Sequence, residues 1–121
     1  MARILIIDDD VQILYALRHT LEREGYEVAD APHGKEGTRL YRENPADLII
    51  TDIIMPEKEG IEIIMELKRD FPDVKIIAIS GGGRVDAEKY LLMAKTLGAN
   101  RTLTKPFARK DLLGAIRELI G

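Results

Sequence analysis

The sequence predicts an α/β fold in which five helices cover both faces of a five-stranded parallel sheet. Strand-like apolar segments alternate with helix-like segments five times along the 121 residues, which is typical of β–α units joined by right-handed crossovers. Residues 4–7 and 48–50 are continuous apolar runs without polar alternation. Strands buried on both faces show this pattern, so we expect both runs to be buried, with 48–50 at the centre of the sheet.

The first strand and helix lie within the first 25 residues. Residues 3–7 form the strand, which is followed by the carboxylates Asp8, Asp9 and Asp10. Asp10 is expected to cap the helix, because its carboxylate can accept hydrogen bonds from the free amides of the first turn. Gly25 is expected to end the helix. The face that the helix buries is expected to carry Leu14, Leu17 and Leu21.

The next three elements are a strand, a helix and the central strand. Residues 26–29 indicate the second strand. Residues 34–43 indicate the second helix, which the Asn-Pro pair at 44–45 stops, because proline disfavours a helical residue before it. Residues 47–52 form the third strand. Pro56 ends regular pairing soon afterwards, since proline has no amide donor.

The remaining elements repeat the alternation. The third helix is expected at about 61–69, the fourth strand at 74–79 and the fourth helix at about 86–97. The fifth strand is expected at 102–104. The last helix carries Leu112, Ile116 and Leu119 at helical spacing. No repeat or linker interrupts the series, so we expect residues 1–121 to form a single domain with no output domain.

Composition and charge exclude several classes of function. The net charge is −3, both signs are spread along the chain and no basic stripe is present, so direct binding of nucleic acid is not expected. The chain has no cysteine for disulfides or thiolate metal sites. It has neither a signal-peptide pattern nor an apolar run of membrane-spanning length. We therefore expect a soluble, cytoplasmic protein.

Polar and charged side chains stand where four of the strands end. Asp8 and Asp9 follow the first strand, Asp52 ends the third, Ser80 follows the fourth and Lys105 the fifth. The carboxyl ends of parallel strands share one edge of the sheet, where ligands bind in open α/β sheets. Each residue alone also fits a helix cap, a turn or a solvated strand end. Together they crowd carboxylates that repel one another unless a cation binds.

Phosphoryl transfer to a carboxylate is the chemistry that this set fits. Asp52 is the candidate nucleophile. Mg²⁺ prefers oxygen ligands and can neutralise the charge that develops during transfer. Lys105 offers a positive charge, and Ser80 offers a hydroxyl donor, to the other phosphoryl oxygens. Because the carboxylates repel one another without a cation, Asp9→Asn is expected to stabilise the metal-free fold.

These residues resemble the receiver domains of two-component response regulators, including single-domain receivers of chemotaxis and sporulation relays. The resemblance extends from Arg3 to Leu119 with receiver-like order and spacing. Each motif is weak alone, but the combination is specific. The matching motifs are Asp8-Asp9, Thr51-Asp52-Ile53-Ile54-Met55-Pro56, Ser80-Gly81 and Lys105-Pro106-Phe107.

The resemblance implies the flavodoxin-like strand order 2-1-3-4-5 and a cis peptide bond between Lys105 and Pro106. It implies that Asp52 is the phosphoacceptor and that Ser80 and Lys105 bind the phosphoryl group. The Mg²⁺ ligands that it implies are Asp9 and Asp52 directly, Asp8 largely through water, and the main-chain carbonyl of Ile54.

The resemblance also implies partners. The donor would be a sensor histidine kinase or a histidine phosphotransfer protein, and the output would be contact with a downstream protein through the fourth helix, fifth strand and fifth helix. The domain would be no enzyme beyond its own phosphorylation and dephosphorylation. Leu92 and Met93 fall off the expected buried stripe of the fourth helix, as stray surface residues or as part of a partner-binding face.

The chain departs from the family pattern at Thr102, where receivers usually carry an aromatic residue that turns inward on activation. The loop after Ser80 is also rich in glycine. We therefore expect the activation signal to pass through residues 81–89 and the fourth helix.

Two other readings compete with the phosphorylation switch. A Mg²⁺-dependent phosphatase or nuclease would use the same acidic cluster but needs a further acid–base group. His19 and His33 are expected away from the reactive edge, on the first helix and in the loop after the second strand. A scaffold that no longer accepts phosphate is disfavoured by the intact set of Asp9, Asp52, Ser80 and Lys105.

Overall fold

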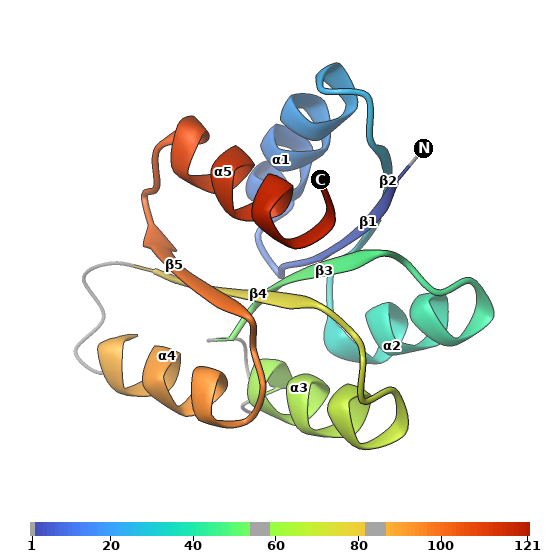
Figure 1. The fold of residues 1–121 in the computed structure, drawn as a ribbon, viewed down its shortest axis with the longest axis vertical. Coiled ribbons are helices and arrows are strands. Elements are labelled where there is room, and N and C mark those ends of the chain that lie inside the picture. Colours follow the sequence, from blue (N-terminus) through green and yellow to red (C-terminus); the bar gives the residue numbers. More distant parts are fainter. Residues whose placement is uncertain (1, 54–58, 82–86) are drawn as a thin grey trace.

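Five parallel strands in the order β2-β1-β3-β4-β5 form one sheet, which confirms the expected fold class and strand order (Figure 1). The computed structural model describes residues 2–53, 59–81 and 87–121. The elements are β1 Arg3–Ile7, α1 Val11–Arg23, β2 Glu27–Ala31, α2 Gly34–Glu43, β3 Leu48–Asp52, α3 Glu59–Asp70, β4 Ile76–Gly81, α4 Ala87–Thr96, β5 Arg101–Lys105 and α5 Arg109–Ile120.

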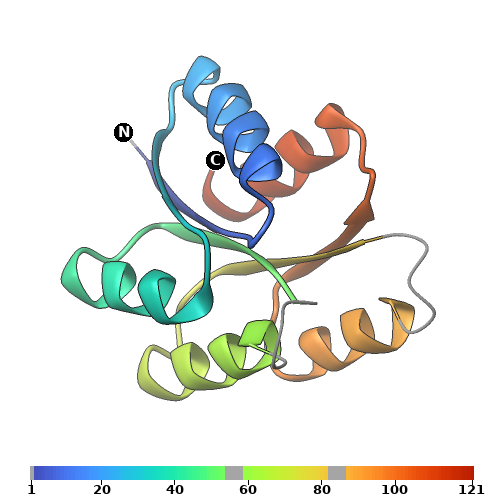
Figure 2. The same ribbon diagram turned by 180° about the vertical axis from the view of Figure 1, so that it is seen from behind.

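The helices form two layers, one on each face of the sheet. Helices α1 and α5 cover one face and α2, α3 and α4 cover the other (Figures 1 and 2). Alternate residues of each strand point to opposite faces of the sheet and pack in the two core layers. In β1, Ile4 and Ile6 pack under α1 and α5, while Leu5 and Ile7 pack on the opposite side. The apolar runs in the sequence are therefore strands with two buried faces, as expected.

Several elements differ from the sequence-based bounds by about two residues. Strand β2 runs from Glu27 to Ala31, because its last residues pair with the end of β1. Strand β4 starts at Ile76, because Val74 N–H donates to the Phe71 carbonyl in the preceding turn. Helix α3 already begins at Glu59, whereas residue 86, the expected start of α4, lies outside the described residues.

The helices α1 and α2 are each capped at their start by a side chain. Asp10 Oδ1 accepts a hydrogen bond from Gln12 N–H at 2.9 Å, which confirms its expected role at α1. His33 Nδ1 accepts one from Glu36 N–H at 3.2 Å and caps α2. None of the helices in the described part of the chain has the length and apolar character that a membrane span requires.

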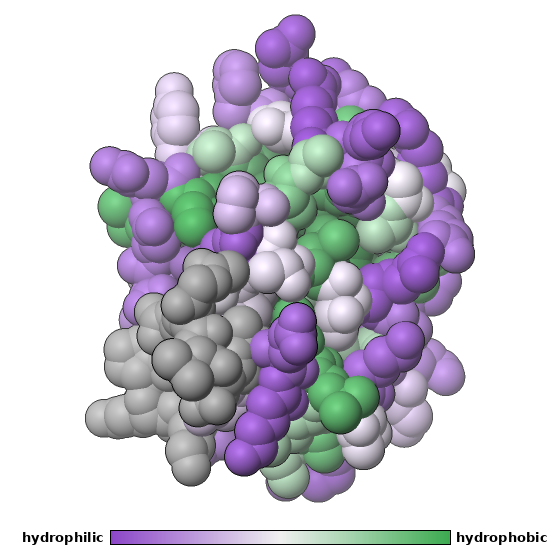
Figure 3. All heavy atoms as spheres, turned by 90° about the vertical axis from the view of Figure 1, so that its left-hand side faces the viewer, coloured by the Kyte–Doolittle hydropathy of each residue, from purple (hydrophilic) through white to green (hydrophobic). Residues whose placement is uncertain are grey.

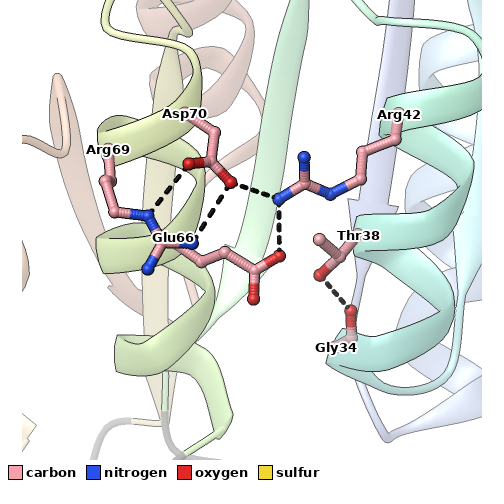
Figure 4. A network of polar contacts seen from close by, with 6 residues as sticks. All are labelled: Gly34, Thr38, Arg42, Glu66, Arg69 and Asp70. Atoms are coloured by element: carbon pink, nitrogen blue, oxygen red, sulfur yellow. Dashed lines mark hydrogen bonds and ion pairs between the residues drawn. The ribbon is translucent and has the colours of Figure 1, made fainter.

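An exposed network of ion pairs joins α2 to α3 (Figure 4). Arg42 donates to Glu66 at 2.9 Å and also to Asp70, while Arg69 pairs with Asp70 from within α3. The hydrogen bonds from Arg69 and Arg42 hold the pKa of Asp70 below its usual range. The Arg42 guanidinium also lies over the Phe71 ring, 5.4 Å from its centroid. These contacts link the exposed sides of α2 and α3.

Candidate functional site

Strands β1, β3, β4 and β5 end on the same edge of the sheet and bring the expected polar residues to it. Asp8 directly follows β1, Asp52 ends β3, and Ser80 and Lys105 stand at the ends of β4 and β5. Figure 3 shows the molecule from the side toward which β4 and β5 run, where apolar side chains reach the surface among hydrophilic ones.

Lys105 joins two of the carboxylates. Its Nζ donates to Asp8 Oδ2 at 2.8 Å and to Asp52 Oδ2 at 3.0 Å. Asp8 is 0 % exposed and Asp52 is 5 % exposed, so both carboxylates are largely removed from water. The other oxygen of Asp8, Oδ1, accepts the N–H of Asp10 at 2.9 Å. Asp8 is thus fixed from two sides and Asp52 is held at the end of the central strand.

Burial and pairing set the protonation behaviour of these groups. Burial raises the pKa of Asp8 above its usual value, and the hydrogen bonds from Lys105 and the Asp10 N–H offset this only in part. Burial works against the charge of Lys105, but its hydrogen bonds to Asp8 and Asp52 outweigh that effect and raise the pKa of Lys105. The site therefore favours the charged form of Lys105 and disfavours the charged form of Asp8.

Three carboxylates form a donor set for a cation. One oxygen each of Asp8, Asp9 and Asp52 lies within 4.8 Å of the others. Asp9 is exposed and reaches the group from the solvent side. A set made only of carboxylate oxygens fits a hard cation such as Mg²⁺ and does not suit softer metals that prefer nitrogen or sulfur.

Ser80 is the uncharged member of the group. The side chain is fully buried, and its Oγ has no hydrogen-bond partner within the part of the chain that the structure describes. Buried hydroxyls are usually paired, so an orphaned one needs an explanation. Ser80 Oγ is therefore available to donate a hydrogen bond to a group bound beside Asp52.

Other expected features are partly accounted for. The Lys105-Pro106 peptide bond is cis, as expected. Ile54, the expected carbonyl ligand, lies outside the described residues, as do residues 82–86 of the expected signalling loop. The expectation that His33 lies away from the reactive edge is wrong, because His33 follows β2 on that edge; its Nδ1, however, is engaged in capping α2.

Sequence reasoning missed one member of the site, the backbone N–H of Asp10 that orients Asp8. The signal was present in the run of three aspartates, because an aspartate often accepts a hydrogen bond from the amide two residues later. The sequence pointed only to the carboxylate of Asp10 as a helix cap, and that role holds as well.

Asp8→Asn is expected to stabilise the metal-free protein above the usual carboxyl pKa. A raised pKa means that the folded state binds more protons than the unfolded state, so stability falls as pH rises from the usual value through the raised one. The gain should be on the order of 1 kcal/mol or more, as for like charges at close range in a partly buried site. The difference in unfolding free energy between variant and wild type can be measured by urea unfolding in chelator, over a range from about pH 4 to about pH 8.

Asp9→Asn serves as the comparison, because Asp9 is exposed and its charge is better screened. We expect a smaller gain for Asp9→Asn than for Asp8→Asn. A loss of stability in Asp8→Asn at neutral pH would mean that the Asp8 carboxylate supports the metal-free fold.

Comparison with known proteins places the chain among signalling domains. Residues 4–117 match the family model of the response regulator receiver domain. Over 118 residues the chain is 35 % identical to the transcriptional regulatory protein PrrA of Mycobacterium tuberculosis, covering 98 % of this chain and 49 % of that protein. It is 34 % identical to the response regulator SaeR of Staphylococcus aureus, covering 99 % of this chain and 51 % of SaeR. The chain thus spans about half the length of these relatives.

Solved structures give the same result. A response regulator receiver domain protein from Clostridium thermocellum superposes with a TM-score of 0.90 at 37 % identity, over 99 % of this chain and 94 % of that one. The response regulator protein TrrA from Thermotoga maritima, in complex with Mg²⁺ and BeF, gives a TM-score of 0.86 at 30 % identity, over 99 % and 100 % of the two chains.

Proposed function

The chain belongs to the family of response regulator receiver domains, and from this premise we propose that it is a phospho-accepting switch of a two-component system or phosphorelay. The observation that carries the proposal is the position of Asp52. Its carboxylate ends the central strand, contacts Lys105 at 3.0 Å and lies within 4.8 Å of the carboxylates of Asp8 and Asp9, with which it could hold a cation. Asp52 is accordingly the phosphoacceptor.

The proposed reaction transfers a phosphoryl group from a phosphohistidine. A carboxylate oxygen of Asp52 attacks phosphorus, a P–O bond forms, and the P–N bond to the histidine breaks, leaving the imidazole to carry the electron pair and take up a proton. Lys105 then offers its ammonium to a phosphoryl oxygen, and the orphaned Ser80 hydroxyl donates to another. Lys105 already lies beside Asp52, so its ammonium has only to redirect a hydrogen bond when the phosphoryl group arrives.

Mg²⁺ is the proposed cofactor. Asp8, Asp9 and Asp52 would hold it, with the carbonyl of Ile54, which lies outside the described residues, as a further ligand. When bound, the cation would neutralise charge on the phosphoryl oxygens. The chain's own contribution is to hold the Asp52 carboxylate toward the phosphorus while Lys105 supplies a second positive charge.

Partners follow from the family. The proposed donor is a histidine kinase or histidine phosphotransfer protein in the cytoplasm, and the proposed output is contact with a downstream protein. Leu92 is 67 % exposed and Met93 39 % exposed on α4, which supports the proposal that α4, β5 and α5 present the contact surface. The domain turns over no substrate other than its own phosphoryl group. No observation favours a phosphatase or nuclease.

Intact mass spectrometry tests the proposal. With Mg²⁺ and acetyl phosphate as a small phosphodonor, the wild-type protein is expected to gain the mass of one phosphoryl group, and in chelator it is expected to gain none. A hydrolase would consume the donor with continuous turnover and carry no label. Steady donor consumption by an unlabelled protein would therefore overturn the proposal.

A further inference from the structure

Gly60, in the first turn of α3, lies against the peptide bond that follows Asp52. The residue is buried, and a Cβ atom added to it would lie 2.3 Å from Ile53 Cα and 2.4 Å from the carbonyl oxygen of Asp52. Side-chain carbons do not approach backbone atoms this closely. The contact between α3 and this peptide bond therefore exists only because residue 60 has no side chain.

The peptide bond is held on its other sides as well. The Ile53 N–H donates to the Ile79 carbonyl at 3.0 Å, which extends the β3–β4 ladder by one bond. The Thr51 hydroxyl donates to the carbonyl of Asp52 at 3.0 Å, and Thr51 itself is fully buried. These bonds leave the peptide bond no free side toward which it could relax, so a push from α3 would be transmitted to the backbone of Asp52, the proposed phosphoacceptor.

Helix α3 is equally fixed. Its inner face is anchored in the core, so it cannot simply retreat to make room for a methyl group at position 60. The buried residues of that face are Ile61, Ile63, Ile64 and Leu67.

We propose that Gly60 is a positioning residue for phosphoryl transfer: it lets α3 seat against the Asp52–Ile53 peptide bond and so sets where the Asp52 carboxylate stands relative to Lys105 and Asp8. The inference rests on the proposed function of Asp52. Displacing a reacting group by about 1 Å can slow a reaction about a hundredfold, even when the displacing substitution lies outside the chemistry.

Gly60→Ala and Gly37→Ala form a matched pair of variants. A Cβ at Gly37 in α2 would meet Ile7 Cδ1 at 2.4 Å, a clash as close as the one at Gly60. That clash is with the end of a flexible side chain in the same core layer, not with the backbone of the phosphoacceptor. Both variants are expected to lose stability, but only Gly60→Ala is expected to shift the Asp52 carboxylate.

The first measurement is the rate of labelling by acetyl phosphate with Mg²⁺, expressed per folded molecule. We expect a loss of about tenfold or more in Gly60→Ala and no change in Gly37→Ala. Thr51→Val, which removes the hydroxyl from the other side of the same peptide bond with little change of shape, is expected to lose severalfold. Equal rates for wild type, Gly60→Ala and Thr51→Val would overturn the inference.

The second measurement is the NMR signal of the Lys105 ε-ammonium in the metal-free protein, which reports its contact with Asp52. We expect a shift in Gly60→Ala and Thr51→Val and none in Gly37→Ala. If Gly60→Ala does not fold, the test rests on Thr51→Val. The inference is overturned if Thr51→Val is labelled at the wild-type rate and its Lys105 signal is unshifted. If wild type itself is not labelled, the proposed function fails, whereas the Lys105 signal still reports whether Gly60 positions Asp52.

Discussion

Asp52→Asn is expected to take up no phosphoryl group under conditions that label the wild-type protein fully. An amide oxygen is a far poorer nucleophile than a carboxylate, and the variant also loses one of the two charges that hold the Lys105 ammonium. Asparagine keeps the shape of the side chain, so the sheet should remain intact. Intact mass and peptide mapping after reaction with acetyl phosphate measure the loss.

Asp73→Asn provides the control for Asp52→Asn. Asp73 is exposed in the turn before β4, at the opposite edge of the sheet, and its substitution removes the same charge. Asp73→Asn should be labelled as wild type. Labelling of Asp52→Asn at the wild-type level would show that another residue accepts the phosphoryl group.

Lys105→Met is expected to destabilise the metal-free protein by about 3 kcal/mol, because removing one partner of a buried ion pair leaves the other charge uncompensated. Here two carboxylates lose their shared partner, and Asp8 is completely buried. Methionine retains most of the side-chain volume, so the loss reports charge and not a cavity. Urea unfolding in chelator measures it, and added Mg²⁺ should reduce it.

Two further variants isolate the origin of that loss. Lys110→Met removes an exposed lysine of α5 and should be nearly neutral. In an Asp8→Asn background, Lys105→Met should lower the free energy of unfolding clearly less than in wild type, because only the Asp52 carboxylate is then left without its partner. An unchanged cost in that background would assign the role of Lys105 to packing.

The order and type of the elements were predictable because the sequence separates them clearly. The run from Leu48 to Ile50 has no polar residue, and it is a central strand. The ends were less predictable, since they depend on pairing: Gly81 belongs to β4 because it pairs with Lys105. Glycine at position 60 was expected to precede its helix, yet it lies inside α3, where a tertiary contact determines its role.

The candidate site was predictable as a set of residues but not as a geometry. Parallel strand ends share an edge, which was enough to gather Asp8, Asp52, Ser80 and Lys105. Nothing in the sequence indicates that the Lys105 ammonium lies between two carboxylates of different strands. That arrangement depends on the reach of one side chain across the sheet edge, and local patterns carry no such information.

The two core layers have a consequence for how the protein is synthesised. The layer beneath α2, α3 and α4 draws its residues from the chain up to Ala99. The opposite layer also needs α5, whose residues Leu112 and Ile116 come after Ala99 in the chain. During translation one face of the sheet therefore acquires its cover well before the other. Until α5 docks beside α1, Ile4 and Ile6 are therefore covered by α1 alone, and this half-covered face is where a chaperone could bind.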